Sequence, residues 1–229
     1  MTGERGNTVQ PPSSPVPAIL GVGGIGVPIA RLWSAAGHEI ALGSREPGRL
    51  RARIAPHRIT GEVTTLVEAA AAADVVLLAV PYPALDEVLD QVGPALAGKI
   101  VIDATNPMGL SEEGHIISTL GTALTSGEAT AKRLPHSHVV RAFSHVMEEL
   151  LWPRGTGQRH FWGMALAGDD PRSKDTVAAL VRDAGFTPVD IGSLAESRPL
   201  DPGGVLFPHM FTPADLARAV GARTPVAAR

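Results

Sequence analysis

The chain has 229 residues and a net charge of −3, with 44% hydrophobic, 4% aromatic and 19% charged residues and no cysteine. This length accommodates one nucleotide-binding domain of about 150–200 residues with a small addition. The composition excludes disulfides and thiolate metal sites, and it shows no basic cluster, no apolar run of about 18 residues and no signal-peptide pattern, so we expect a cytoplasmic protein without nucleic-acid or membrane partners.

The predicted elements begin after a polar tail. Residues 1–14 are rich in Pro and Ser, and we expect them to be disordered. The sequence then predicts strands at 16–20, 39–43, 74–80, 100–104, 139–143, 164–167 and 187–190, and helices at 25–36, within 61–73, and at 85–92, 173–184 and 213–220. This alternation is typical of parallel βαβ units. We therefore predict an α/β fold, with a Rossmann-type, doubly wound, mainly parallel sheet over 15–192 and a small loop-rich C-terminal segment over 193–229 that completes the substrate cleft.

A glycine-rich loop follows the first predicted strand and opens the first helix. It reads Gly21-Val22-Gly23-Gly24-Ile25-Gly26. In such a loop Gly21 permits a tight turn, Gly23 lets the backbone approach a pyrophosphate, and Gly26 lets the helix pack close to the strand. The phosphates would also lie against free N–H groups at the positive end of the helix dipole. A purely structural turn is the alternative, but the order of strand, loop, helix and second strand favours a dinucleotide site that includes Gly24 and Ile25.

The end of the second predicted strand indicates which dinucleotide binds. An NAD site usually has Asp or Glu about 20 residues past the loop, where it binds the ribose hydroxyls. Here the strand ends with Ser44 and Arg45, and Arg49 follows four residues later. A guanidinium binds a 2′-phosphate with two parallel hydrogen bonds, and a serine hydroxyl can donate a third. We therefore predict NADP(H), with Glu46 pointing away from the phosphate; the alternative is that Arg45 and Arg49 are solvated surface charges.

At this point the sequence resembles a known family, the NADPH-dependent reductases of coenzyme F420, a deazaflavin. It is also similar to the cytosolic part of the transmembrane ferric reductases of animals. The resemblance covers residues 18 to 207. The matching motifs are Ala18-Ile19-Leu20-Gly21 with the glycine loop, Gly37-His38-Glu39, Gly43-Ser44-Arg45, Ala79-Val80-Pro81, Asp103-Ala104-Thr105-Asn106-Pro107, Val139-Val140-Arg141-Ala142-Phe143 and Ala167-Gly168-Asp169-Asp170.

The resemblance also implies where the second substrate lies. In such enzymes it stacks on the nicotinamide near the carboxyl ends of the strands, as ligands of open α/β sheets generally do. The positions that match the nicotinamide end of the cofactor site are Val80, Pro81, Asn106 and Pro107. The candidates for lining the acceptor are Gly109, Ser144, His145 and Met147. The family usually reads Asn-Thr after Ala-Phe, so Ser144-His145 departs from its pattern.

Two polar pairs have alternative interpretations. His136 and His138 form an H-x-H pair, but no third ligand is evident near them, so we predict a solvated loop and no metal site. Asp169 and Asp170 precede Pro171 at a predicted helix start. We expect them to cap that helix rather than to act as paired catalytic carboxylates.

Aromatic residues gather around a loop that is rich in Gly and Arg. Trp152, Phe161 and Trp162 could line a pocket, form a dimer contact or only pack. The resemblance and the apolar segments 150–152 and 161–162 favour a homodimer.

The sequence thus predicts an NADP-dependent oxidoreductase with a small-molecule redox substrate. The first hypothesis is hydride transfer between NADPH and coenzyme F420, which needs no metal, nucleophile or carboxylate pair because the cofactors carry the chemistry. The second is an NADPH-dependent reductase of an organic C=N, C=O or C=C group, with His145 as the catalytic proton donor; in the alternative, His145 only packs or hydrogen-bonds. The third is an NADP-binding protein without turnover.

Overall fold

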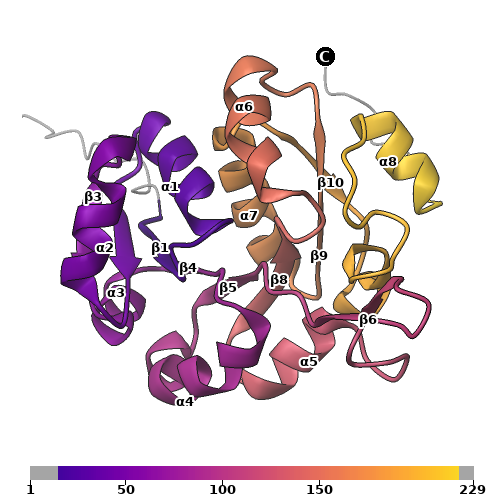
Figure 1. Ribbon diagram of the computed structural model, residues 1–229, viewed down its shortest axis with the longest axis horizontal. Coiled ribbons are helices and arrows are strands. Elements are labelled where there is room, and N and C mark those ends of the chain that lie inside the picture. The colour runs from indigo at the N-terminus through magenta and orange to yellow at the C-terminus, as the bar shows by residue number, and fades with distance from the viewer. Residues whose placement is uncertain (1–14, 222–229) are drawn as a thin grey trace, which may run out of the picture.

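The main sheet has the strand order β10-β9-β8-β5-β4-β1-β2-β3 (Figure 1). The computed structural model describes residues 15–221, so the predicted tail over 1–14 lies outside the described residues. The strands are β1 (Pro17–Leu20), β2 (Ile40–Gly43), β3 (Gly61–Thr64), β4 (Val75–Leu78), β5 (Ile100–Asp103), β8 (His138–Ala142), β9 (Gly163–Gly168) and β10 (Thr187–Asp190). A separate two-stranded sheet contains β6 (Met108–Leu110) and β7 (Ile116–Ser118).

The strands pair in parallel at every step of the main sheet except one. Ala18 of β1 lies opposite Ala41 of β2 on one side and Val76 of β4 on the other. The exception is β8 and β9, which are antiparallel, while β9 and β10 are parallel to each other. The predicted Rossmann-type, mainly parallel sheet is confirmed, with β9 and β10 running opposite to the other six strands.

Helices cover both faces of this sheet, with α1, α6 and α7 above it and α3, α4 and α5 below it in Figure 1. The helices are α1 (Gly26–Ala35), α2 (Pro47–Ile54), α3 (Leu66–Ala72), α4 (Leu85–Leu96), α5 (Ser126–Arg133), α6 (Glu148–Gly157), α7 (Pro171–Asp183) and α8 (Pro213–Ala219). The last of these packs against β9 and β10. Within residues 15–221 no helix has both the length and the apolar character of a membrane span.

Each face of the sheet has its own hydrophobic core. On the face of α1 the largest buried side chain is Trp33, whose Nε1 donates to the carbonyl of Leu180 in α7 at 2.9 Å and whose ring meets Phe143 edge-on. On the other face the small side chains of Ala69 and Ala70 in α3 pack against the sheet. Fully buried strands explain how a chain with few aromatic residues forms a core.

The sequence predictions missed several elements. These are α2, β3, the β6–β7 hairpin, α5 and α6. Helix α5 carries a start signal, since Thr125 accepts from the backbone of Glu128 and the Glu128 carboxylate accepts from the backbone of Thr125. Helix α6 was missed because Pro153 lies inside it, and an internal proline usually indicates the end of a helix.

Candidate functional site

The glycine loop connects β1 to α1 and leaves room above its backbone. Gly21 has a φ of +93°, and a Cβ there would lie 2.6 Å from the backbone of Ala79. A Cβ on Gly26 would lie 2.3 Å from the carbonyl oxygen of Gly21. The structural roles expected of these two glycines are confirmed. A Cβ on Gly23 would meet nothing within 4 Å, which is the open space that a closely approaching phosphate needs, although that role of Gly23 stays a prediction.

The start of α1 is suited to an anion. Ile25 occupies its N-cap position and makes no side-chain cap, and the first turn holds no acidic residue of its own. The backbone N–H groups of a helix start attract negative charge when no side chain caps them. From α6, however, the Glu148 carboxylate reaches over Gly24, with an oxygen 1.4 Å from where a Cβ on Gly24 would be. An acidic side chain therefore lies beside the predicted phosphate site.

Polar and cationic side chains surround the tip of β2. A cavity of about 260 Å³ there is lined by the glycine loop, Ser44, Arg45, Arg53 and the segment 79–81. The Ser44 hydroxyl accepts from the N–H of Glu46 at 3.0 Å, so its own proton is free to be donated elsewhere. Arg45 is exposed. This arrangement brings together the predicted residues for the phosphate and the ribose end of a dinucleotide.

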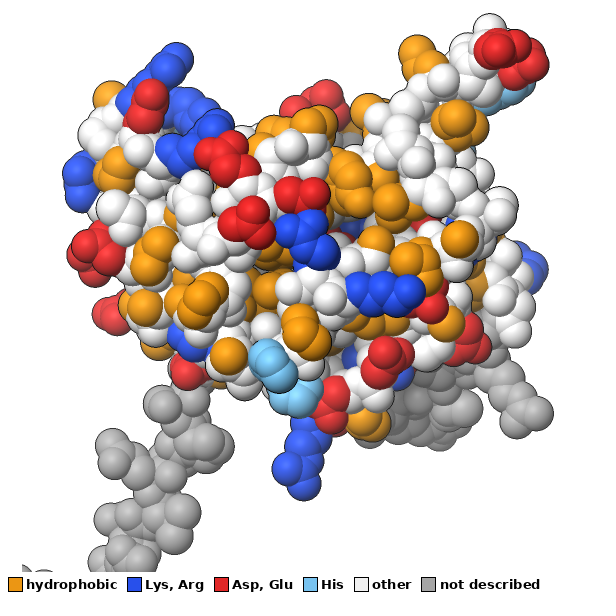
Figure 2. Space-filling view, turned by 90° about the horizontal axis from the view of Figure 1, so that it is seen from below, with side chains coloured by type: hydrophobic (Ala, Val, Ile, Leu, Met, Phe, Trp, Pro, Cys, Tyr) orange, Lys and Arg blue, Asp and Glu red, His pale blue; other side chains and the backbone are white. Residues whose placement is uncertain are grey.

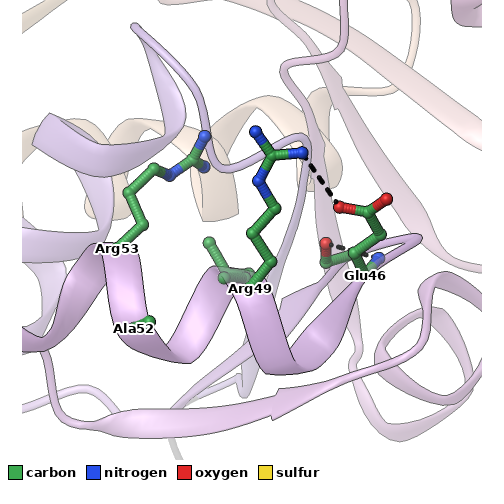
Figure 3. Close-up of a pocket in the computed structure, with 6 residues that line it drawn as sticks. Glu46, Arg49, Ala52 and Arg53 are labelled. Carbon is green, nitrogen blue, oxygen red and sulfur yellow. Dashed lines mark hydrogen bonds and ion pairs between the residues drawn. The ribbon is translucent and has the colours of Figure 1, made fainter.

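Helix α2 extends this cavity with a second hollow of about 660 Å³, to which Glu46, Arg49 and Arg53 contribute. Figure 3 shows Arg49 and Arg53 projecting side by side from α2, with Arg49 paired to Glu46. The Arg49 Nη1 lies 3.3 Å from the Glu46 carboxylate. Arg49, three residues along, pairs with the Glu46 carboxylate, which lines this hollow but not the cavity at the glycine loop, so the prediction that Glu46 points away from the 2′-phosphate stays a prediction.

Arg53 was missed by the sequence predictions. Its Nη2 donates to the carbonyl of Val22, so the side chain spans from α2 to the glycine loop. The available signal was its spacing of four residues from Arg49, which puts both on one face of a helix. The guanidinium groups of Arg49 and Arg53 and the Glu46 carboxylate thus line this hollow, and Arg45 and Arg53 line the neighbouring cavity.

The other predicted cofactor residues follow β4 and β5. These strands are neighbours in the sheet, so their carboxyl ends lie at one edge. Val80 and Pro81 line the same cavity as the glycine loop. Asn106 and Pro107 follow β5, but neither lines that cavity. The Asn106 side chain is partly exposed and already makes two hydrogen bonds, which are described below.

A wholly buried arginine, Arg141 on β8, holds this edge together. Its Nη1 donates to the carbonyl of Asp103 at 3.2 Å and to that of Thr105, and its Nη2 donates to the Asn106 side-chain oxygen at 3.0 Å. The carboxylates of Asp103 and Asp201 lie 3.4 and 3.5 Å from the guanidinium. The sequence predictions gave Arg141 no role, although a charge inside an apolar strand is a signal of such a network.

The candidate catalytic residue, His145, follows β8 and is fully buried. Its Nε2 accepts from the N–H of Ala165 at 3.1 Å, which leaves the proton on Nδ1, 3.2 Å from the carbonyl of His209. Burial lowers the pKa of His145 to about 4, and the hydrogen bond to His209 opposes that shift. A neutral imidazole with both nitrogens bound to backbone groups is poorly suited to give a proton to a substrate. These contacts favour the alternative that His145 packs and hydrogen-bonds.

The other candidates for lining the acceptor are dispersed. Ser144 is buried and its carbonyl accepts from Asn106, whereas Met147 is 48% exposed. Gly109 lies in the β6–β7 hairpin, where a Cβ would meet the side chain of Thr119, the residue after β7, at 2.9 Å. Figure 2 shows a hollow containing hydrophobic side chains between a group of Lys and Arg side chains and a projecting arm with acidic groups at its tip.

The remaining candidates make contacts within the fold. Asp170 accepts from the backbone of Ser173 and caps α7, as predicted. The Asp169 carboxylate instead accepts from the N–H of Leu194 at 2.9 Å. Phe161 and Trp162 pack edge-to-face at 5.0 Å between ring centres. Within residues 15–221 no group of three or more His, Asp or Glu side chains is arranged to hold a metal.

Comparison with known proteins shows what the chain is similar to. The family model described as "NADP oxidoreductase coenzyme F420-dependent" matches residues 17–107. The metalloreductase STEAP3 of Rattus norvegicus is 32% identical over 195 residues, which are 83% of this chain and 36% of that protein. The chain therefore spans about a third of the length of that relative.

Solved structures match over more of their length. The hypothetical protein SMa0349 of Sinorhizobium meliloti is 30% identical with a TM-score of 0.76, over 86% of this chain and 95% of that chain. A protein of Arthrobacter sp. FB24 that carries the name of an F420-dependent NADP reductase is 24% identical with a TM-score of 0.68, over 92% of this chain and 96% of that chain.

Proposed function

Because the chain belongs to the family of NADP oxidoreductases described as coenzyme F420-dependent, we propose that it transfers a hydride between NADPH and a deazaflavin, coenzyme F420. Members of this family are NADP-dependent oxidoreductases. The choice of acceptor and the residues that bind it are the proposed part.

The tip of β2 is the observation that supports NADPH most directly. Ser44 and Arg45 stand where an NAD site has an acidic residue. They line the same cavity as the glycine loop. Arg49 and Arg53 add two cationic groups, whereas Glu46 lines the same hollow and Glu148 lies over Gly24 of the loop. The Ser44 hydroxyl and the Arg45 guanidinium would bind the 2′-phosphate, and the glycine loop would bind the diphosphate.

The residues around His145 and Asn106, on the other side of the proposed cleft, favour a hydride acceptor that needs no proton from an acidic side chain. His145 is buried and bound at both nitrogens, and Asn106 is engaged at both ends of its amide. Hydride transfer between two heteroaromatic rings needs mainly their alignment, and the proton that completes the reduced deazaflavin comes from water. NADPH supplies the hydride when it is bound. The chain contributes the glycine loop, rigid Pro81 and the ordered edge around Asn106 as a fixed support.

The C-terminal segment completes this cleft in the proposal. Asp201 approaches the buried Arg141, and a Cβ on Gly203 would lie 2.7 Å from the carbonyl oxygen of Ile116 in β7. The segment is therefore tied to both sides of the region where the acceptor would enter.

A spectrophotometric screen tests the proposed function. Purified protein with NADPH and oxidised coenzyme F420 is expected to lose the visible absorbance of the deazaflavin in step with NADPH consumption. Parallel reactions contain flavins, ferric chelates or cyclic imines. Consumption with an imine or a ketone but not with the deazaflavin would replace the proposal with the second function, and NADPH binding without consumption in any reaction would leave the third.

A further inference from the structure

The wholly buried Arg141 fixes which way the amide of Asn106 is turned. Arginine has only N–H donors, so the group that faces its Nη2 at 3.0 Å must be the Asn106 oxygen and not the nitrogen. The Asn106 Nδ2 correspondingly donates to the carbonyl of Ser144 at 2.8 Å, a group that can only accept. The two partners agree, so the usual ambiguity of an asparagine amide is resolved by chemistry.

This orientation decides what Asn106 can offer to a ligand. Its oxygen is occupied by Arg141 and one of its two N–H groups by Ser144, and the side chain is partly exposed at the end of β5. One N–H donor remains, together with the second lone pair of the oxygen that faces Arg141. The neighbouring Ser144 hydroxyl is buried and makes no hydrogen bond within residues 15–221, so it is a second unused polar group at this edge.

The guanidinium that sets this orientation is itself held from two sides. The Asp103 carboxylate accepts from the Thr105 hydroxyl at 2.7 Å and from the Thr130 hydroxyl at 2.9 Å, and it lies 3.4 Å from Arg141. The Asp201 carboxylate accepts from the N–H of Ser126 at 3.1 Å and lies 3.5 Å from Arg141. With its charges paired and bonded, the arginine cannot turn without breaking buried contacts.

We propose that Arg141 is a positioning residue that holds Asn106 as a hydrogen-bond donor toward the carbonyl oxygen of the nicotinamide carboxamide. The inference rests on the proposed function, because it takes the carboxyl ends of β4 and β5 as the nicotinamide end of the site. A carboxamide has one acceptor and two donors, and only its oxygen complements an N–H. Asn106 therefore selects the carbonyl, and the amino group of the carboxamide is not needed for recognition by this residue.

Binding of cofactor analogues tests this directly, without turnover. The 3-acetylpyridine analogue of NADP⁺ keeps the carbonyl and lacks the amino group, whereas the thionicotinamide analogue replaces the oxygen with sulfur, a weak acceptor. By calorimetry the wild type is expected to bind the acetylpyridine analogue about as tightly as NADP⁺, and the thionicotinamide analogue about fivefold more weakly. Equal binding of all three, or weaker binding of the acetylpyridine analogue alone, overturns the inference.

Three variants assign the effect. Asn106→Ala removes the donor and Asn106→Asp replaces it with an acceptor that still faces Arg141, so both are expected to lose the about fivefold discrimination. Arg141→Lys keeps the buried charge, but its single ammonium cannot bond Asp103, Thr105 and Asn106 as the guanidinium does, so Asn106 is held mainly by Ser144 and the same ratio is expected to fall. Retention of the wild-type ratio in the two Asn106 variants overturns the inference even if Arg141→Lys does not fold. Retention in a folded Arg141→Lys protein overturns the role of Arg141.

Two controls separate this inference from the proposed function. Arg133→Lys changes an arginine on α5 that is paired with Asp86 and Asp90 away from this edge, and it is expected to keep the wild-type ratio. Adenosine 2′,5′-bisphosphate lacks the nicotinamide and is expected to bind all folded variants alike. Failure of the wild type to bind this ligand or NADP⁺ contradicts the proposed cofactor site. Binding of both without analogue discrimination contradicts only the inference about Arg141 and Asn106.

Discussion

At the tip of β2, Arg45 and Arg49 extend into solvent, whereas Arg141 on β8 is completely buried at the other side of the proposed cleft. The exposed side chains have few partners within residues 15–221, where Arg49 pairs with the Glu46 carboxylate alone, 3.3 Å away. The buried one has its Nη1 and Nη2 groups bonded to carbonyl and amide oxygens, and it lies between two carboxylates.

This difference in burial separates arginines that can recognise a ligand from an arginine that positions other parts of the protein. An exposed guanidinium keeps its hydrogen-bonding groups available, and it meets a phosphate with little rearrangement of the protein. The buried guanidinium of Arg141 has its Nη1 and Nη2 groups bonded within the fold, and removing one partner of a buried ion pair costs about 3–5 kcal/mol. The cofactor side is therefore built to bind a charged ligand. The other side keeps its charges internal and would present ordered, mostly uncharged groups to the acceptor.

The largest expected effect breaks the cofactor side at the glycine loop. Gly21→Ala places a methyl group against the backbone of Ala79 in a left-handed conformation, so it should cost about 3 kcal/mol or more of folding free energy and abolish NADPH binding. Gly23→Ala is the matched control, because its methyl group enters open space. It should fold normally and bind NADPH about tenfold more weakly or worse. Urea unfolding and calorimetry measure both, and normal NADPH binding by Gly23→Ala would contradict the predicted phosphate position.

The cofactor side was more predictable from sequence than the acceptor side, for a physical reason. The glycine loop and the Ser44-Arg45 pair are local patterns, in which spacing along the chain fixes position in space. Helix α2 was missed because only Leu50 and Ile54 are buried in it and Pro47-Gly48 begins it. With the helix missed, Arg53 had no predicted place.

The acceptor side depends on contacts between distant segments. Arg141 joins Asp103 of β5 to Asp201 of the C-terminal segment, and no spacing in the sequence indicates that these three residues meet. The role of His145 likewise depends on Ala165 and His209. The residue types were visible, but only the fold shows that their polar groups turn inward.

The second prediction sharpens the contrast between exposed and buried arginines. Arg45→Ala should weaken NADPH binding by about 1.5–3 kcal/mol, because a charge-assisted pair with the 2′-phosphate is lost, and should leave NADH binding nearly unchanged. Because Arg45 is exposed, the melting temperature should not change. Calorimetry with both cofactors measures the effect. Equal affinity of the wild type for NADPH and NADH would contradict the assignment of this pocket.

The third prediction concerns a buried group of the acceptor side. The folded-state pKa of His145 is about 4, below its ordinary value of 6.5, so the unfolded state takes up the proton first as the pH falls. The stabilisation is complete above pH 6.5 and is lost progressively toward pH 4, by about 2 kcal/mol at pH 5.

Urea unfolding at pH 7.5 and pH 5 tests this in pairs. The loss of stability on acidification should be about 2 kcal/mol smaller in His145→Gln than in the wild type, and unchanged in His136→Gln, which alters an exposed histidine. Turnover of His145→Gln with NADPH should stay near the wild-type rate. A fall of about a hundredfold with NADPH binding intact would instead identify His145 as the proton donor of the second hypothesis.

The smallest expected effect lies where the two sides meet. Glu148 starts α6, on the acceptor side, but its carboxylate lies over Gly24 of the cofactor loop. A bound diphosphate would bring like charge close to this carboxylate, so the side chain must move aside or weaken binding. Glu148→Gln keeps the shape and removes the charge, and it should strengthen NADPH binding by about threefold at low salt, with a smaller gain at high salt.

Glu149→Gln is the matched control in the same helical turn, and its carboxylate is not among the atoms nearest Gly24. Calorimetry at two salt concentrations compares the three proteins. Weaker binding by Glu148→Gln would mean that the carboxylate accepts a hydrogen bond from the cofactor, and an equal gain in both variants would reduce the effect to net charge alone.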